Sequence, residues 1–190
     1  SPLEILHQSN LMNYFGGKIS LAANKIQQFF GNPNFNSSLN INSVYRELKI
    51  EPVKISKPDG TKLALYFLPH IPERLLSVLL KENKIMFTSP CDESYAMVLF
   101  LHQKRSKSSA PSVVVPSLEI HHLSLPQYFD IVVWSHESIT APNKEKTGTF
   151  QIISVPEISL SSIRIKEVAP RYVLVVDFFP HSDKKKKIKV

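Results

Sequence analysis

The sequence has a single cysteine, Cys91, among its 190 residues. One cysteine can form neither an internal disulfide nor a zinc site built on several thiolates, and it favours a reducing compartment. Glycine is scarce, at five residues, and neither a Walker sequence nor a dinucleotide-binding fingerprint occurs. We therefore expect no phosphate cradle made from glycine-rich backbone. The sequence also contains no Gly-x-Ser-x-Gly elbow, the motif that would indicate a serine nucleophile.

Long apolar runs are also absent, and none reaches the roughly 18 residues of a membrane span. The first residues, Ser-Pro-Leu-Glu-Ile-Leu-His, lack the charged start and apolar centre of a signal peptide. The sequence therefore predicts no membrane association. Because the chain starts abruptly without a methionine, we expect a processed or partial chain.

What the sequence does have is apolar content typical of a globular protein, at 43%, together with a net charge of +7. The positive charge favours a polyanionic partner. Four of the positive charges form one run, Lys184–Lys187, near the C-terminus. Such a run is compatible with a solvated tail, and the alternatives are nuclear targeting and contact with phosphates.

The order of apolar and turn residues predicts an α/β chain. Helices are expected at Leu3–Phe15, ended by Gly16-Gly17, at Ile19–Phe30, and from Pro72-Glu73 to Leu80. Strands are expected at Val53–Ser56, Lys62–Leu68, Ala96–Leu101, Asp130–Trp134, Phe150–Val155 and Tyr172–Phe179, and the first two form a hairpin. The segments Ser106–Ser112 and Thr140–Gly148 are predicted to be polar loops. This pattern indicates a layered fold, with mixed sheets packed together or flanked by helices.

Two histidines stand at the ends of predicted strands: His102 follows Ala96–Leu101, and His136 lies just past Asp130–Trp134. In open α/β sheets ligands bind at the carboxyl ends of strands, and two imidazoles from neighbouring strand ends can bind one metal ion. The alternative is that both histidines are polar residues that mark the ends of core strands. The adjacent pair His121-His122 is predicted to lie in an exposed loop.

Five segments carry a family resemblance. They are LEILHQSNLMNYFGG (Leu3–Gly17), KLALYFLPHIPERLL (Lys62–Leu76), LFLHQKRSK (Leu99–Lys107), FDIVVWSHES (Phe129–Ser138) and the strand region Phe150–Ser162. In this order they resemble the Mre11 family of DNA double-strand-break repair nucleases, and the Trp-x-His-Glu form points to that family within the calcineurin-like metallophosphoesterases. The resemblance implies a layered, metallophosphoesterase-like α/β fold, of which residues 1–190 form the C-terminal part of the core, with mixed sheets flanked by helices.

The resemblance also implies a site for two Mn²⁺ ions that cuts DNA, with His102 and His136 as ligands of one ion. Ser138 stands where the family has its third histidine, Ser135 replaces a glycine of the same motif, and Glu157 replaces another glycine. A serine hydroxyl is a far poorer ligand than imidazole. The family's N-terminal metal-binding motifs match no part of this chain, so the chain as given is predicted to be inactive.

The implied partners are DNA, a Rad50-type ATPase, an Nbs1-type subunit and a second copy of the protein, acting in the nucleus. Leu3, Leu6, Leu11 and Met12 are the candidate dimer interface, and the alternative is that they pack on their own sheet. The candidate DNA contacts are Lys104, Arg105 and Lys107, which could equally form an ordinary solvated loop. Because of the altered motif, the alternative function is a catalytically inactive, phosphoesterase-derived scaffold that binds DNA or protein partners.

Overall fold

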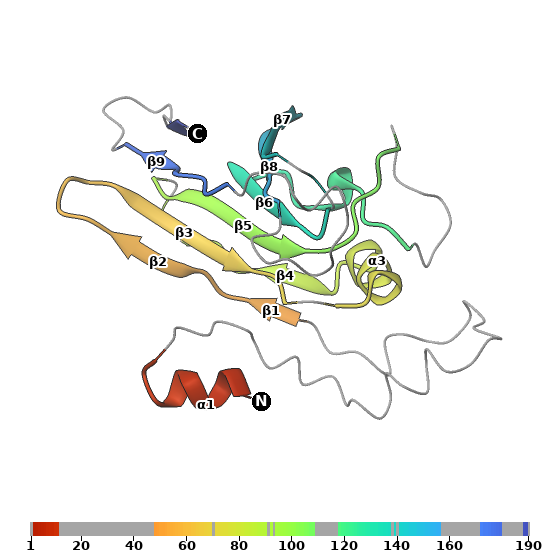
Figure 1. Cartoon of the computed structure of the whole chain (residues 1–190), viewed down its shortest axis with the longest axis horizontal. Coiled ribbons are helices and arrows are strands. Elements are labelled where there is room, and N and C mark those ends of the chain that lie inside the picture. The colour runs from red at the N-terminus through yellow and green to blue at the C-terminus, as the bar shows by residue number, and fades with distance from the viewer. Residues whose placement is uncertain are drawn as a thin grey trace.

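A mixed six-stranded sheet forms the centre of the chain in a computed structural model (Figure 1). The structure describes residues 2–11, 48–69, 71–90, 92, 94–108, 118–137, 139, 141–156, 172–179 and 188–189. The sheet has the order β2-β3-β5-β6-β8-β7. Its strands are β2 (Val53–Ser56), β3 (Lys62–Phe67), β5 (Ala96–His102), β6 (Ile131–Ser135), β7 (Asn143–Thr147) and β8 (Phe150–Ser154). The predicted α/β class with a mixed sheet is confirmed.

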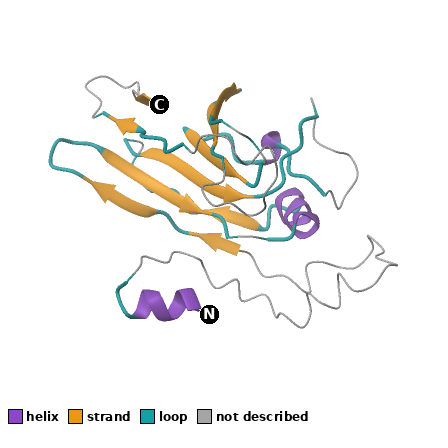
Figure 2. Cartoon of the chain, viewed as in Figure 1, coloured by secondary structure: helices purple, strands orange, loops and turns teal. Residues whose placement is uncertain are grey.

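The four central strands β3, β5, β6 and β8 are parallel, and both edge strands are antiparallel to their neighbours. The predicted hairpin β2–β3 turns at Lys57–Gly60, where Gly60 has a φ of 88°. A glycine adopts this left-handed conformation without a steric penalty. Most of the regular structure in the described chain is strand (Figure 2), and none of its helices is long and apolar enough to cross a membrane.

The edge strand β7 corrects the prediction of a loop at Thr140–Gly148. Its sequence, Asn-Lys-Glu-Lys-Thr, is charged and has no apolar alternation. The strand nevertheless pairs with β8 along its whole length, from Asn143↔Ser154 to Thr147↔Phe150. An edge strand has one solvated side, and charges there discourage pairing with other chains. Backbone pairing, which composition does not reveal, therefore determines this element.

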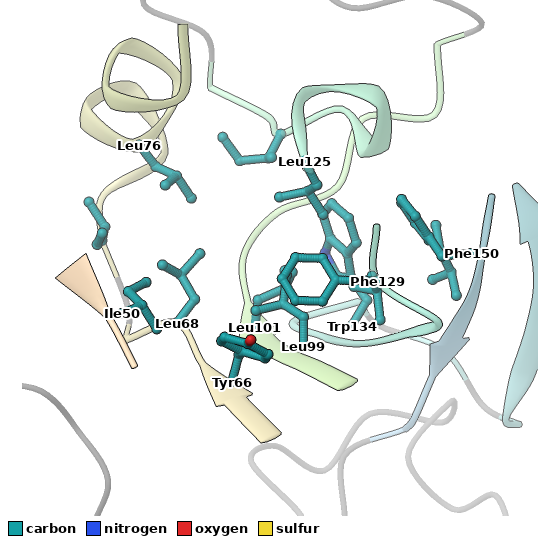
Figure 3. Packing of buried hydrophobic residues seen from close by; sticks show 14 of the residues in the cluster. Ile50, Tyr66, Leu68, Leu76, Leu99, Leu101, Leu125, Phe129, Trp134 and Phe150 are labelled. Carbon is teal, nitrogen blue, oxygen red and sulfur yellow. The ribbon is translucent and has the colours of Figure 1, made fainter. Parts of the chain in front are cut away.

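One face of the sheet carries the larger core, formed with helix α3 (Glu73–Lys81), the short 3₁₀-helix η2 (His122–Ser124) and the parallel pair β1 (Leu48–Ile50) and β4 (Ile85–Phe87). The predicted helix after Pro72 is confirmed, and it buries Leu75, Leu76, Val78 and Leu79. Figure 3 shows Leu76 from α3 and Leu125 beside η2 directed toward the sheet residues. The ring of Phe129 lies edge-on to Tyr66, with centroids 5.3 Å apart.

The opposite face carries a smaller cluster, Val98, Ile131 and Ile153, against which Leu174, Val176 and Phe178 pack. The prediction of one strand at Tyr172–Phe179 is wrong in extent. Only Asp177–Phe178 forms a strand, β9, which pairs with β10 (Ile188–Lys189). The rest is extended and covers the sheet face with alternate side chains instead of joining the hydrogen-bonded ladder.

The N-terminal helix α1 spans Pro2–Gln8, so the predicted helix to Phe15 is also wrong. Asn10 has a φ of 56°, its N–H donates to the carbonyl of His7, and the N–H of Leu11 donates to the carbonyl of Leu6. These two bonds form a Schellman motif, which ends a helix with a left-handed residue such as Asn. Ile5, Leu6 and Leu11 are exposed. The Leu3 side chain, Met12 and the predicted helix Ile19–Phe30 lie outside the described residues, and the dimer interface stays a prediction.

Candidate metal site at the ends of two strands

His102 and His136 meet at the carboxyl ends of two neighbouring parallel strands. His102 is the last residue of β5, and His136 directly follows β6. Nδ1 of His136 lies 3.0 Å from Nε2 of His102, and the rings are nearly perpendicular, at 83°. The predicted placement of the two side chains is confirmed.

The backbone of His136 accounts for this approach. In the register of β5 and β6, His102 lies opposite Ser135, so these two side chains share one face of the sheet. In a continued strand, residue 136 would point to the other face. His136 instead has a φ of 83°, which is uncommon for a residue other than glycine. The strand therefore ends at Ser135, and the turned backbone carries the second imidazole to the first.

The two imidazoles fit part of a metal site. The two nitrogens lie at hydrogen-bond distance, 3.0 Å apart, which is close enough for one ion about 2.1 Å from each nitrogen to contact both. Both side chains are exposed and accessible to an ion. Among the described residues, no group of three or more His, Cys, Asp or Glu side chains could hold a metal ion. His102 and His136 could thus supply two nitrogen ligands to one ion.

Two of the three departures from the family motif, Ser138 and Glu157, are not among the described residues. Glu137, the carboxylate nearest to the missing ligand in sequence, is described. Its side chain is 12% exposed, its Oε2 accepts a hydrogen bond of 3.0 Å from Ser154 Oγ, and it pairs with Arg105. The carboxylate is thus engaged by Ser154 of β8 and by Arg105.

Arg105 has an internal position that the sequence did not indicate. Its side chain is 10% exposed, its Nη2 donates to the carboxylate of Glu145, and its guanidinium lies 5.7 Å from the Trp134 ring centroid. The hydrogen bond from Arg105 holds the pKa of Glu145 below its usual range. A guanidinium already bound by two carboxylates has little capacity left for phosphate. The role was missed because Glu145 lies on the unpredicted strand β7.

Lys104 and Lys107 are exposed, in contrast to Arg105. The Lys104 ammonium lies 3.1 Å from Glu119, and its backbone N–H donates to Glu73. Surface ion pairs of this kind contribute little to stability and exchange readily with other anions. Phosphate contact by these two lysines stays a prediction.

The prediction of an exposed His121-His122 pair is wrong for His121, which is 3% exposed. Its Nδ1 accepts the N–H of Leu123, so Nε2 carries the hydrogen and donates to the carbonyl of Ser108, 2.9 Å away. His121 therefore caps η2 through its side chain. Pairing on both ring nitrogens explains how a polar residue is buried here.

His122 makes stability depend on pH. Burial, followed by the neighbouring His121 and Arg105, lowers the pKa of its imidazole. As the pH falls below the unfolded value of about 6.5, the unfolded chain takes up a proton that the folded chain resists, so the free energy of unfolding decreases. We expect His122→Gln to flatten the dependence of stability on pH between pH 7.5 and 5, measured by urea denaturation. His7→Gln, at an exposed site on α1, is the control, and an equal flattening by both variants would contradict the assignment.

Comparison with known proteins relates the chain to one group. It is 28% identical over 186 residues to the double-strand break repair protein MRE11 of Arabidopsis thaliana, covering 93% of this chain and 22% of that protein. It is 22% identical over 179 residues to the double-strand break repair protein mus-23 of Neurospora crassa, covering 92% and 20%. Human MRE11 is 26% identical over 141 residues, covering 70% and 19%. The chain thus spans about a fifth of the length of these relatives. No protein-family model matches it.

Proposed function

Because this chain belongs to an Mre11-like family, we propose that its protein acts in the repair of DNA double-strand breaks. We further propose a manganese-dependent DNA nuclease that works in the nucleus as a homodimer, with Rad50-type and Nbs1-type partners. The observation that carries the proposal is the His102–His136 pair, 3.0 Å apart at the ends of β5 and β6. Two exposed imidazoles at this edge of a parallel sheet suit a divalent transition metal.

The role of this chain in such a reaction is to hold ligands. His102 and His136 would bind one ion through neutral nitrogens, and a bound pair of ions would activate water and stabilise the charge on the phosphate. The strand ends that present the imidazoles are tied together, because the buried Trp134 Nε1 donates to the carbonyl of Gln103 at 2.7 Å. Lys104 and Lys107 would contact the DNA backbone without regard to base sequence.

A second candidate is a catalytically inactive scaffold that binds DNA or protein partners. It is favoured by the lack of a third metal ligand among the described residues, and by the serines at positions 135 and 138. A scaffold of this kind would retain DNA affinity through its lysines, and the affinity would fall steeply with salt.

A manganese-dependent cleavage assay on linear DNA distinguishes the two candidates, with the full-length protein compared with its His136→Ala variant. For the nuclease, we expect weak cleavage that the variant abolishes. For the scaffold, we expect no cleavage by either protein and equal, salt-sensitive DNA binding by both. Absence of both cleavage and DNA binding would contradict the nuclease and the DNA-binding scaffold, and would leave a scaffold for protein partners.

A further inference from the structure

A partly buried polar cluster lies beside the two histidines, and the proposed function does not use it. It consists of Arg105, Glu137, Glu145 and Ser154, packed against Trp134. Nη1 of Arg105 lies 3.8 Å from Glu137 Oε2, and Ser154 Oγ donates to the same oxygen. The cluster connects the segments that follow β5 and β6 with the strands β7 and β8.

Each connection is close in sequence to one of the histidines. Glu137 is the residue after His136, and Arg105 is three residues after His102. Trp134, two residues before His136, donates to the carbonyl of Gln103, the residue after His102. The two strand ends are therefore joined both before and after the turn at His136. Side-chain contacts so placed restrict the backbone that carries each imidazole.

The turn at His136 needs such support. A φ of 83° is sparsely populated for residues with a Cβ atom, and it persists only where the surrounding structure determines it. The Glu137 side chain is 12% exposed, and its Oε2 accepts a hydrogen bond from Ser154 and lies 3.8 Å from Arg105 Nη1. A buried ion pair is weak evidence for stability, since well-packed apolar residues often replace one without loss.

We propose that Arg105 and Glu137 are positioning residues that hold the left-handed backbone at His136 and so preset the spacing of the His102 and His136 nitrogens for a divalent transition metal ion. The metal half of this proposal rests on the proposed function, and the backbone half does not. Groups that orient metal ligands commonly change metal affinity by about 10-fold to 100-fold when they are removed.

The test uses Glu137→Gln in the whole chain. Glutamine keeps the length of the side chain and an oxygen that can accept from Ser154, but it removes the charge that pairs with Arg105. Two properties are measured: the affinity for Co²⁺ by calorimetry, and, without metal, the φ of residue 136 and the contact between the two imidazoles by NMR. We expect the affinity for Co²⁺ to fall by about 10-fold. We also expect a shifted φ at residue 136 and a weaker contact between the two rings.

Two controls separate positioning from general stability. Asn143→Ala removes a hydrogen bond to the far oxygen of Glu145 and leaves Glu137 and Arg105 in place. Ile131→Val lowers stability from within the smaller core cluster, at the opposite end of β6 from His136. We expect both controls to keep the affinity for Co²⁺ within about twofold of that of the unaltered chain, because neither changes the contacts of Glu137.

The outcomes are separable. If Glu137→Gln changes neither the NMR signals of the histidines nor the Co²⁺ affinity, or if Ile131→Val lowers that affinity equally, the positioning role is overturned. If the unaltered chain binds no Co²⁺, the proposed metal role and the metal half of the inference both fail, while the NMR measurement still decides the backbone half. If Glu137→Gln does not fold, Ser154→Ala, which removes only the hydrogen bond to Glu137 Oε2, decides by the same two measurements.

Discussion

A Ser138→His substitution is expected to raise the manganese-dependent nuclease activity of the full-length protein by about 10-fold to 100-fold, the range in which changes around a metal site act. Two ions must share the nucleophile and the phosphate for this reaction. A neutral hydroxyl at position 138 binds a transition metal far more weakly than an imidazole, so the second ion is poorly held. The measurement is the initial rate of DNA cleavage at saturating Mn²⁺.

The neighbouring carboxylate does not compensate for this serine. Glu137 is bound by Arg105 and Ser154 and is largely buried, so it cannot turn to the metal without breaking these contacts. The matched control is Ser138→Ala, which we expect to leave the activity unchanged because little metal binding is lost with the hydroxyl. Full activity of the unaltered protein, with no gain from histidine, would show that Ser138 is not the defect. The chain as given is expected to bind Mn²⁺ weakly and to leave DNA uncut.

Replacing Trp134 with alanine is expected to lower the free energy of unfolding by about 3–5 kcal/mol. Trp134 is fully buried in the larger core and lies opposite Leu101 in the register of β5 and β6. The substitution removes the indole and leaves a cavity, and it also leaves the buried carbonyl of Gln103 without its donor at 2.7 Å. The measurement is denaturation in guanidinium chloride.

The matched variant Trp134→Phe separates these two effects. Phenylalanine fills most of the space but donates no hydrogen bond, and we expect a smaller loss of about 1–3 kcal/mol, the cost of an unsatisfied buried polar group. If alanine and phenylalanine cost the same, packing around Trp134 contributes little, and the hydrogen bond to Gln103 accounts for the effect.

The central part of the fold could be predicted from the sequence because parallel strands buried on both faces leave a clear pattern. Ala96–Leu101 is a continuous apolar run, and it appears as β5 between β3 and β6. The placement of His102 and His136 followed from the same pattern, since residues that follow adjacent parallel strands meet at one edge. The helix α3 was recognisable from Pro72-Glu73 and the apolar spacing that follows.

The elements that escaped prediction depend on contacts that leave no local pattern. β1 and β4 are three residues long, too short for any periodicity. β7 is charged, and its strand conformation comes from pairing with β8. The early end of α1 depends on a left-handed Asn10, although glycine is the commoner residue at such ends. Arg105 was taken for a surface residue because the carboxylates that bury it come from distant segments.

The parallel connections of the sheet also determine when the histidines can meet during folding. His102 and His136 are 34 residues apart in the chain, and their contact requires the pairing of β5 with β6, which no short hairpin can provide. Each parallel pair closes a long loop before its contacts form, and such pairings are intrinsically slow. The two imidazoles can therefore come together only once β5 has paired with β6, and a probe of their contact would report that pairing during folding.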